Sequence, residues 1–321
     1  MTDYDLKTMT IKTKHFEHKA VLLNESIEAL AIDPAGIYID GTFGRGGHSQ
    51  LIMAQLGDSG RLIAFDKDPQ AIATAEEKFA DDSRFSIHHG SFAELEKHLA
   101  SQGLCGKVNG ILLDLGVSSP QLDDPQRGFS FQQAGPLDMR MNDQQGISAA
   151  QWINKAKEEE IANVLYEYGE ERYSRRIAKA IVLARENELL NDTKQLAEIV
   201  KQAHPRWEKK KHPATRSFQG IRIFINNELG DLDECLQQSY RCLAEKGRLA
   251  VISFHSLEDR KVKRFFKHMV EGDKLPPDLP VMEEAVNRKM KLVGKRIKAG
   301  KQELSDNPRA RSAVLRVASK L

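Results

Sequence analysis

Residues 36–52 read "GIYIDGTFGRGGHSQLI" and place a glycine-rich turn between an apolar run and a helical pattern. The run at 37–40 is β-branched and aromatic and ends at a carboxylate, which favours a buried strand. The order of strand, glycine turn and helix N-terminus presents backbone N–H groups to ligand oxygens. The alternative is a tight turn that only packs the strand against the helix, because a glycine pattern alone is a weak signal.

The sequence of the turn matches neither of two common nucleotide-binding loops. A dinucleotide loop has the pattern Gly-x-Gly-x-x-Gly, and Ser49 stands where its third glycine belongs. A P-loop has Lys followed by Ser or Thr after its glycines, and no such pair follows here. What remains is Asp40 ahead of the glycines, a carboxylate that suits a cationic amine better than a pyrophosphate. The stretch therefore indicates a ligand that has no pyrophosphate.

A second carboxylate, Asp66, ends the next apolar run at 61–66. It follows Gly46 by 20 residues, the position from which an acidic side chain accepts hydrogen bonds from both ribose hydroxyls. Helix capping is the alternative role, but Asp68 is better placed to cap a helix that begins near Pro69. A ribose without a pyrophosphate, beside an amino-acid-like group, describes S-adenosylmethionine.

The other strand-like runs extend this pattern into a sheet. The runs lie at 37–40, 61–66, 84–89, 110–116, 247–255 and 311–319. Helical patterns of about ten residues separate the first four, which predicts crossover connections and parallel strands. We therefore predict an α/β fold with a doubly wound, Rossmann-like sheet. Because Asp40, Asp66 and Asp114 all end strands, we expect them to line one crevice; a buried structural role is the alternative for Asp114.

The middle of the chain interrupts the alternation. Residues 118–146 are rich in Gly, Pro, Asp and Gln and predict a long loop, whereas 148–204 are almost wholly helical in pattern, with Asp192 as an N-cap. Apolar spacing predicts one long helix over 221–243, and the charged segment 271–305 predicts a loop. The expected domains are a sheet domain in two parts, 1–122 and 213–321, and an inserted all-helical, substrate-recognition domain at 123–212.

Composition and charge narrow the class of protein. The 321 residues are 40% hydrophobic and 29% charged, with no long apolar run and no signal-peptide pattern, which predicts a cytoplasmic protein that does not enter a membrane. Its three cysteines form no CxxC pair, so neither a disulfide framework nor a zinc site is indicated.

Residues 260–321 carry 17 Lys and Arg against 7 Asp and Glu, whereas 1–259 carry 31 against 39. The basic end is either a solubilising tail or a surface that faces nucleic-acid phosphates.

Seven motifs together resemble those of the RsmH family, also called MraW, the bacterial 16S rRNA cytosine-N4 methyltransferases. In chain order they are "YIDGTFGRGGHS", "LLDLGVSSPQLDDPQRGFSF", "GPLDMRM", "YGEER", "HPATRSFQ", "VISFHSLEDRKVKRFF" and "NPRARSAVLR". The resemblance runs from about residue 18 to 317. It implies a methyltransferase sheet with a helical insertion, S-adenosylmethionine as cofactor, and a cytidine in the decoding centre (P site) of 16S rRNA in the small ribosomal subunit as substrate. No metal and no obligatory protein partner are implied.

The resemblance also implies roles for single residues. Gly46, Gly47 and His48 are expected at the methionine part of the cofactor, Asp66 at the ribose and Phe92 against the adenine. Asp114 and Gln121 complete the expected cofactor pocket.

The reaction itself points to hydrogen-bond acceptors. The N4 amine of cytosine is a poor nucleophile, so it must be aimed at the methyl group while acceptors hold its N–H groups. Asp114, Ser118 and Ser119 are the candidate acceptors; serines in a simple turn are the alternative. Arg140 and His255 are candidate substrate contacts, and a structural histidine is the alternative for His255.

Two rival functions remain open from the sequence. A methyltransferase of another amino group, in adenine or a protein side chain, would have the same cofactor crevice. A non-catalytic RNA-binding or ribosome-assembly factor would keep the fold and the basic end. Binding of S-adenosylmethionine separates the second rival from the enzymes.

Overall fold

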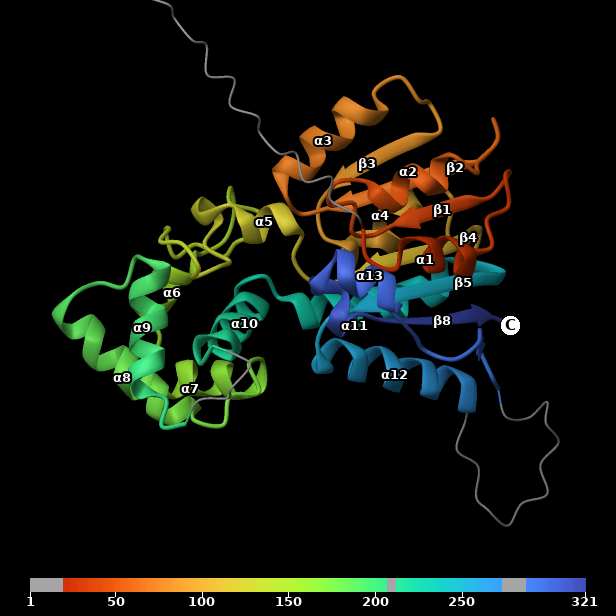
Figure 1. Ribbon diagram of the computed structural model, residues 1–321. Helices are drawn as coiled ribbons and strands as arrows, with labels where there is room; N and C mark the ends of the chain where they lie inside the picture. The colour runs from red at the N-terminus through yellow and green to blue at the C-terminus, as the bar shows by residue number, and fades with distance from the viewer. Residues whose placement is uncertain (1–19, 207–211, 273–286) are drawn as a thin grey trace, which may run out of the picture.

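The computed structural model describes residues 20–206, 212–272 and 287–321 (Figure 1). Part of the expectation for 271–305 lies outside these ranges. Figure 1 shows two parts: a sheet layered with helices, and a group of helices beside the edge where the strands of its first half end.

A single mixed sheet confirms the predicted fold class. Within the described residues it has eight strands in the order β3-β2-β1-β4-β5-β8-β6, with β7 also paired to β8. The strands are β1 (Ile37–Asp40), β2 (Arg61–Asp66), β3 (Phe85–His89), β4 (Val108–Asp114), β5 (Leu243–Ser253), β6 (Met290–Leu292), β7 (Ile297–Lys298) and β8 (Val314–Lys320). β1 to β5 are parallel, and β8 runs antiparallel to β5. The chain order reverses between β1 and β4, which is where ligands bind in doubly wound sheets.

Alternating side chains of the strands give the sheet two apolar faces. On one face α1 (Leu23–Leu30), α2 (Gly47–Met53) and α3 (Pro69–Phe79) cover side chains such as Tyr38 and Leu62. On the other, α4 (Leu95–Ser101), α11 (Glu228–Cys242) and α12 (Ser256–Glu271) cover Ile39, Ile63 and Ile111. Because side chains alternate along a strand, both layers are built from the same short apolar runs.

The helices of the second part have a core of their own. They are α6 (Ala149–Ile153), α7 (Glu158–Glu167), α8 (Ser174–Asn187), α9 (Thr193–Ala203) and α10 (Ala214–Ile225). Their buried side chains form one cluster that runs in sequence from Phe129 to Ile221. Asp192 caps α9 as predicted, since its carboxylate accepts the N–H groups of Lys194 and Gln195.

Two predictions about secondary structure were wrong. The helix expected over 221–243 is broken between α10 and α11, where Asn227 has a left-handed φ of 51° that Asn tolerates better than most residues. The break lets the Asn226 amide donate to the Met139 carbonyl, a contact that apolar spacing does not reveal. The segment 271–305 is also no simple loop, because its described part contains β6, β7 and α13 (Lys301–Asp306).

The predicted loop at 118–146 is mostly irregular but begins with two short helical elements, α5 (Ser119–Asp123) and the 3₁₀ turn η2 (Pro125–Arg127). Two further 3₁₀ turns, η1 (Phe92–Glu94) and η4 (Pro308–Ser312), precede α4 and β8. Among the described residues no helix is long and apolar enough to cross a membrane.

Candidate active site

A cavity of about 790 Å³ opens at the carboxyl ends of β1, β2 and β4, beside the N-terminus of α2. Most of the residues predicted from the sequence line it, namely Gly47, His48, Asp66, Phe92, Asp114, Ser118, Ser119 and Gln121. Its wall also includes Met141 and Arg222, from the loop and helix on the far side. The cavity therefore joins the predicted cofactor residues to the second part of the molecule.

The shape of the glycine turn depends on Gly46. Gly46 is the N-cap of α2 with a left-handed φ of 76°, and a Cβ at this position would lie 2.7 Å from the Phe43 ring. Any other residue would be both strained and in collision there. Gly46 thus shapes the turn, while Gly47 and His48 face the cavity.

Asp40 corrects one expectation, because it lies beneath the turn and does not line the cavity. Its side chain is 1% exposed, and its carboxylate accepts the Ser49 hydroxyl at 2.7 Å and the Thr42 N–H at 3.1 Å. Burial raises the pKa of Asp40, and the two hydrogen bonds oppose that shift. Ser49, which takes the place of the third glycine of a dinucleotide loop, therefore ties α2 to the end of β1.

Asp66 is held by its own loop and faces the cavity. One carboxylate oxygen accepts the Gly44 N–H at 2.7 Å, and the other accepts the Asp68 N–H at 2.8 Å. Burial raises the pKa of Asp66 to about 6, despite these two bonds. Each oxygen of an ionised carboxylate has a second lone pair, so both ribose hydroxyls can still be accepted.

Asp114 has an unsatisfied oxygen at the centre of the site. Its Oδ1 is buried with no hydrogen-bond partner among the described residues, and its Oδ2 lies 3.8 Å from Nδ1 of His48. Burial, with the nearby charges of Asp40 and Glu258, raises the pKa of Asp114 well above its usual range. Such a carboxylate is stabilised by a positively charged or N–H-bearing ligand.

Ser118 and Gln121 form a capping box at the start of α5. Gln121 Oε1 accepts the Ser118 N–H at 2.9 Å, and Ser118 Oγ accepts the Gln121 N–H at 3.5 Å. The structural role considered for Ser118 is therefore real, although Ser118 and Ser119 also line the cavity. Gln121 turns its amide N–H towards Asp68 Oδ2, at 2.8 Å.

The two predicted substrate contacts lie outside the cavity lining. Arg140 forms a paired contact with Asp138, with 2.7 Å between Nη2 and Oδ2, and also donates to the carbonyls of Gln145 and Gly146. His255 is the N-cap of α12, where its Nδ1 accepts the Glu258 N–H at 3.4 Å. Both side chains are thus engaged within their own segments.

Sequence reasoning missed a set of charged residues in and beside the cavity. The carboxylate of Glu228 is paired with Arg222, at 2.8 Å from Nε and 2.9 Å from Nη2. Ligand atoms of Glu228, His255 and Glu258 lie within 4.8 Å of one another, as a metal site would require. Arg222 already balances the charge of Glu228, so we assign no metal. Arg222 sits inside an apolar helical pattern, where nothing in the sequence marks it.

The side chains present fit S-adenosylmethionine. The buried carboxylate of Asp114 suits a positively charged ligand, and Asp66 suits a ribose. Phe92 and Leu115 add apolar wall in the same cavity, as an adenine requires. The fit rests on the composition of the pocket and on its position in the fold.

Comparisons with known proteins agree with this picture. The model of a family described as the MraW methylase family matches residues 15–321. The curated ribosomal RNA small subunit methyltransferase H of Thioalkalivibrio sulfidiphilus (strain HL-EbGR7) is 58% identical over 305 residues, which cover 95% of this chain and 97% of that protein.

Solved structures are more distant. A putative rRNA methylase from Clostridium thermocellum has a TM-score of 0.45 at 12% identity, with 94% of this chain and 98% of that chain covered. A putative methyltransferase from Streptococcus mutans, in complex with SAH, has a TM-score of 0.39 at 12% identity, with 94% and 99% covered. Likeness at this level carries no argument about function.

Proposed function

The chain belongs to the MraW methylase family, and from this premise we propose that it methylates the exocyclic N4 of one cytidine in the decoding centre (P site) of 16S rRNA. The methyl donor is S-adenosylmethionine, the cofactor predicted from the sequence. The observation that carries the proposal is the unsatisfied, buried oxygen of Asp114 in a cavity bordered by Asp66 and Ser119.

Asp114 is the proposed acceptor for the amine. S-Adenosylmethionine supplies an electrophilic methyl group when bound, so the chain needs to aim a nitrogen and accept its N–H groups. The Asp114 oxygen can accept one of these N–H groups, and Ser119 offers a second polar contact in the same wall. Because its pKa is raised, the ionised Asp114 is also a stronger base than an ordinary carboxylate for the proton that the methylated nitrogen must lose.

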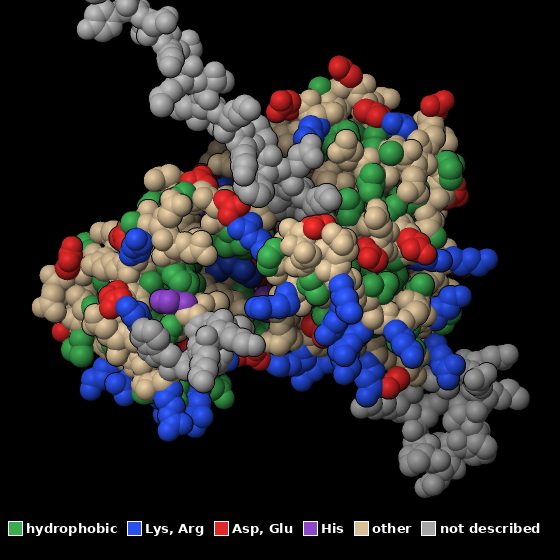
Figure 2. Space-filling model, in the orientation of Figure 1, with side chains coloured by type: hydrophobic (Ala, Val, Ile, Leu, Met, Phe, Trp, Pro, Cys, Tyr) green, Lys and Arg blue, Asp and Glu red, His purple; other side chains and the backbone are tan. Residues whose placement is uncertain are grey.

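An RNA substrate is supported by a basic face. Lys263, Arg264 and Lys267 project from α12 into solvent, and Lys295 and Arg296 are exposed between β6 and β7. Figure 2 shows Lys and Arg side chains gathered along the side of the molecule formed by these elements. Phosphates bind such clusters without regard to sequence, so the face would orient the RNA while the cavity selects the base.

The helical part is proposed as the substrate-recognition domain, inserted at 123–212. It has an apolar core of its own, which α10 completes with residues beyond 212. Met141, in the loop that precedes its helices, lies in the cavity wall. A base in folded RNA must leave its stack to reach the cavity. We place the protein in the cytoplasm, with the small ribosomal subunit as its partner and no further protein required.

A nucleoside digest of 16S rRNA tests the assignment. A strain without this chain should lack an N4-methylated cytidine that returns when the purified protein and S-adenosylmethionine are added to its small subunits. Unchanged N4-methylcytidine in the deletion strain would refute the substrate. A methylated adenine or protein side chain would support the first rival.

The non-catalytic rival is tested by calorimetry with S-adenosylhomocysteine. Saturable binding that weakens on Asp66→Asn supports an enzyme. A protein that binds small-subunit RNA and shows no binding of S-adenosylhomocysteine would be an assembly factor.

A further inference from the structure

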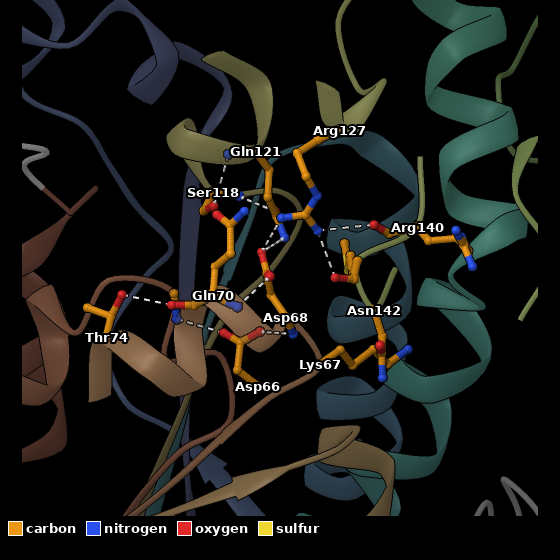
Figure 3. A network of polar contacts seen from close by, with 12 residues as sticks. Asp66, Lys67, Asp68, Gln70, Thr74, Ser118, Gln121, Arg127, Arg140 and Asn142 are labelled. Atoms are coloured by element: carbon orange, nitrogen blue, oxygen red, sulfur yellow. Dashed lines mark hydrogen bonds and ion pairs between the residues drawn. The ribbon is translucent and has the colours of Figure 1, made fainter. Parts of the chain in front are cut away.

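Three consecutive side chains at the end of β2 hold three distant parts of the molecule. Asp66 is the last residue of β2, and Lys67 and Asp68 form the short turn that leads to α3. Figure 3 shows Asp66 and Asp68 within one polar network, which reaches α5 and the loop before α6, with Lys67 beside it. The sequence suggested a ribose contact for Asp66 and a helix cap for Asp68, and it assigned Lys67 no role.

The first connection leads to the glycine turn beside the proposed ribose contact. Asp66 accepts N–H groups from Gly44, in the glycine turn, and from Asp68. The same carboxylate is the proposed ribose acceptor. A change in the position or protonation of the Asp66 carboxylate therefore alters its hydrogen bond to the backbone N–H of Asp68.

The second connection leads to the break between α10 and α11. Lys67 Nζ donates to the Asn226 carbonyl at 2.8 Å and pairs with Asp231 at 2.5 Å. Asn226 in turn accepts the Met141 N–H at 2.7 Å, and its amide donates to the Met139 carbonyl at 2.7 Å. The turn at this break is thus hydrogen-bonded to residues 139 and 141 of the loop that borders the substrate side of the cavity.

The third connection is a buried ion pair. Asp68 Oδ1 caps α3, and its Oδ2 accepts both Gln121 Nε2 at 2.8 Å and Arg127 Nη1 at 2.9 Å. Arg127 uses its other terminal nitrogen to donate to the carbonyls of Arg140, at 3.2 Å, and Met141, at 2.8 Å. Asp68 and Arg127 are only 3% and 6% exposed.

A helix cap does not require this arrangement. One carboxylate oxygen satisfies the start of α3, and an exposed Asp would serve equally well. Burying Asp68 and Arg127 is costly unless the geometry is good, and such pairs are better at fixing one arrangement than at adding stability. Here the arrangement that is fixed is the position of Met141 relative to Asp66.

We propose that Asp68 and Arg127 are positioning residues that couple occupancy of the cofactor site to the seating of the loop 124–146 on the substrate side. A ribose on Asp66 holds the turn at 66–68 in place, and the Asp68–Arg127 pair transmits that restraint to the carbonyls of Arg140 and Met141. A loop that is seated first binds substrate with less loss of conformational entropy. The consequence for RNA binding rests on the proposed function, but the coupling within the chain does not.

Hydrogen exchange of the loop amides measures the coupling directly. In the unchanged protein, saturating S-adenosylhomocysteine should slow exchange in peptides from 124–146 by about 5-fold or more, the lower end of ordinary couplings between sites. Arg127→Lys keeps a cation opposite Asp68 but cannot also reach the two loop carbonyls, so the protection should fall below about 2-fold. Calorimetry with the same probe should show its affinity within about 3-fold of the unchanged protein.

Arg84→Lys is the matched control. Arg84 also forms a two-point pair with a nearby carboxylate, that of Asp82, and donates to the carbonyl of Leu56, but it lies away from the cavity. It should leave the protection of the loop unchanged. Asp68→Asn is the second variant: if folded by circular dichroism, it should also lose the protection.

The outcomes separate the two proposals. Full protection of the loop in folded Arg127→Lys, or no protection in the unchanged protein, overturns the coupling whatever the substrate is. On small ribosomal subunits, Arg127→Lys should raise KM for the particle more than it lowers kcat; equal loss in Arg84→Lys would indicate a merely structural effect. If the unchanged protein methylates no cytidine, the proposed function fails, while the exchange result still decides the coupling.

Discussion

The cavity has two walls that are built in different ways: the proposed cofactor wall at Gly47, Asp66 and Asp114, and the proposed substrate wall at Met141 and Arg222. Around the glycine turn the side-chain contacts join near neighbours in sequence: Asp40 binds Ser49 nine residues later, and Gly44 binds Asp66 at a separation of 22. On the substrate wall they join distant residues, since Met141 binds Asn226 at a separation of 85 and Lys67 binds Asn226 at 159. The glycine turn is therefore held within one strand–helix–strand unit, whereas the substrate wall exists only when two parts of the fold have assembled.

The largest effect, a loss of kcat, is expected from Asp114→Asn, because Asp114 is the proposed acceptor for the substrate amine. Loss of the charged acceptor should lower kcat by about 100- to 1000-fold, as for other preorganised polar groups. The free energy of unfolding should not fall, because the raised pKa shows that the ionised Asp114 is disfavoured in the free protein. Single-turnover assays and urea unfolding measure the two quantities.

Asp40→Asn is the contrasting control, since it changes the same kind of residue beneath the turn. It should cost about 1–3 kcal/mol of stability, because an amide cannot accept from both Ser49 and Thr42. An activity loss at Asp40 as large as at Asp114 would contradict the division between lining and support.

Asp66 predicts a pH dependence of cofactor binding. The ionised form is the proposed ribose acceptor and the pKa of Asp66 is about 6, so affinity for S-adenosylhomocysteine should be full above pH 7 and fall as pH drops below 6. Asp66→Asn should weaken binding by about 10- to 100-fold and abolish the pH effect. Calorimetry from pH 5 to 8 makes the comparison.

The stability of the free protein should respond to Asp66 with the opposite sign. A carboxyl whose folded pKa is raised above its unfolded value of 3.8 contributes stability below about pH 4, and that contribution is lost as pH rises through 6. Cofactor affinity that also improved below pH 6 would show that Asp66 does not accept the ribose.

The basic face tests the substrate side at longer range. Reversing Lys263 and Arg264 to Glu should weaken binding to small-subunit RNA by about 10-fold and make binding less dependent on salt. The log–log slope should fall by about 0.7–0.9 for each phosphate that the variant no longer neutralises. Reversal of Lys97 and Lys107, exposed on α4 and before β4, serves as the control with equal charge change. If both double variants weakened RNA binding equally, the effect would come from net charge and not from the basic face.

The smallest effect is expected from Ser118→Ala. As an N-cap, Ser118 should contribute about 0.5–2 kcal/mol to stability, and kcat should change by no more than a few-fold. Ser119→Ala is the comparison, because Ser119 lines the cavity without being the cap. If Ser118→Ala instead slowed turnover by about 100-fold with unchanged stability, Ser118 would return to the catalytic acceptors.

Some elements were readable from the sequence and others were not. β1 and β2 begin and end where predicted, because each is a short apolar run that ends at a carboxylate and has a glycine directly beside it, Gly41 after β1 and Gly60 before β2. The helix break at Asn226 was missed, since the apolar spacing continues across it and only the bonds to Met139 and Met141 explain the turn. Arg127 was missed for a similar reason: a lone arginine in a polar loop gives no sign that it will be buried.

By itself, the sequence determined the alternation of the first four strands with helices, the glycine turn, and the acids at the ends of those strands. It did so because these features depend on backbone conformation and on neighbours a few residues away. Only the tertiary structure decided that Asp40 supports the turn while Asp114 lines the cavity, and that Asp68 and Arg127 join the two walls. Burial and long-range hydrogen bonds decide such roles, and both depend on which distant segments pack together.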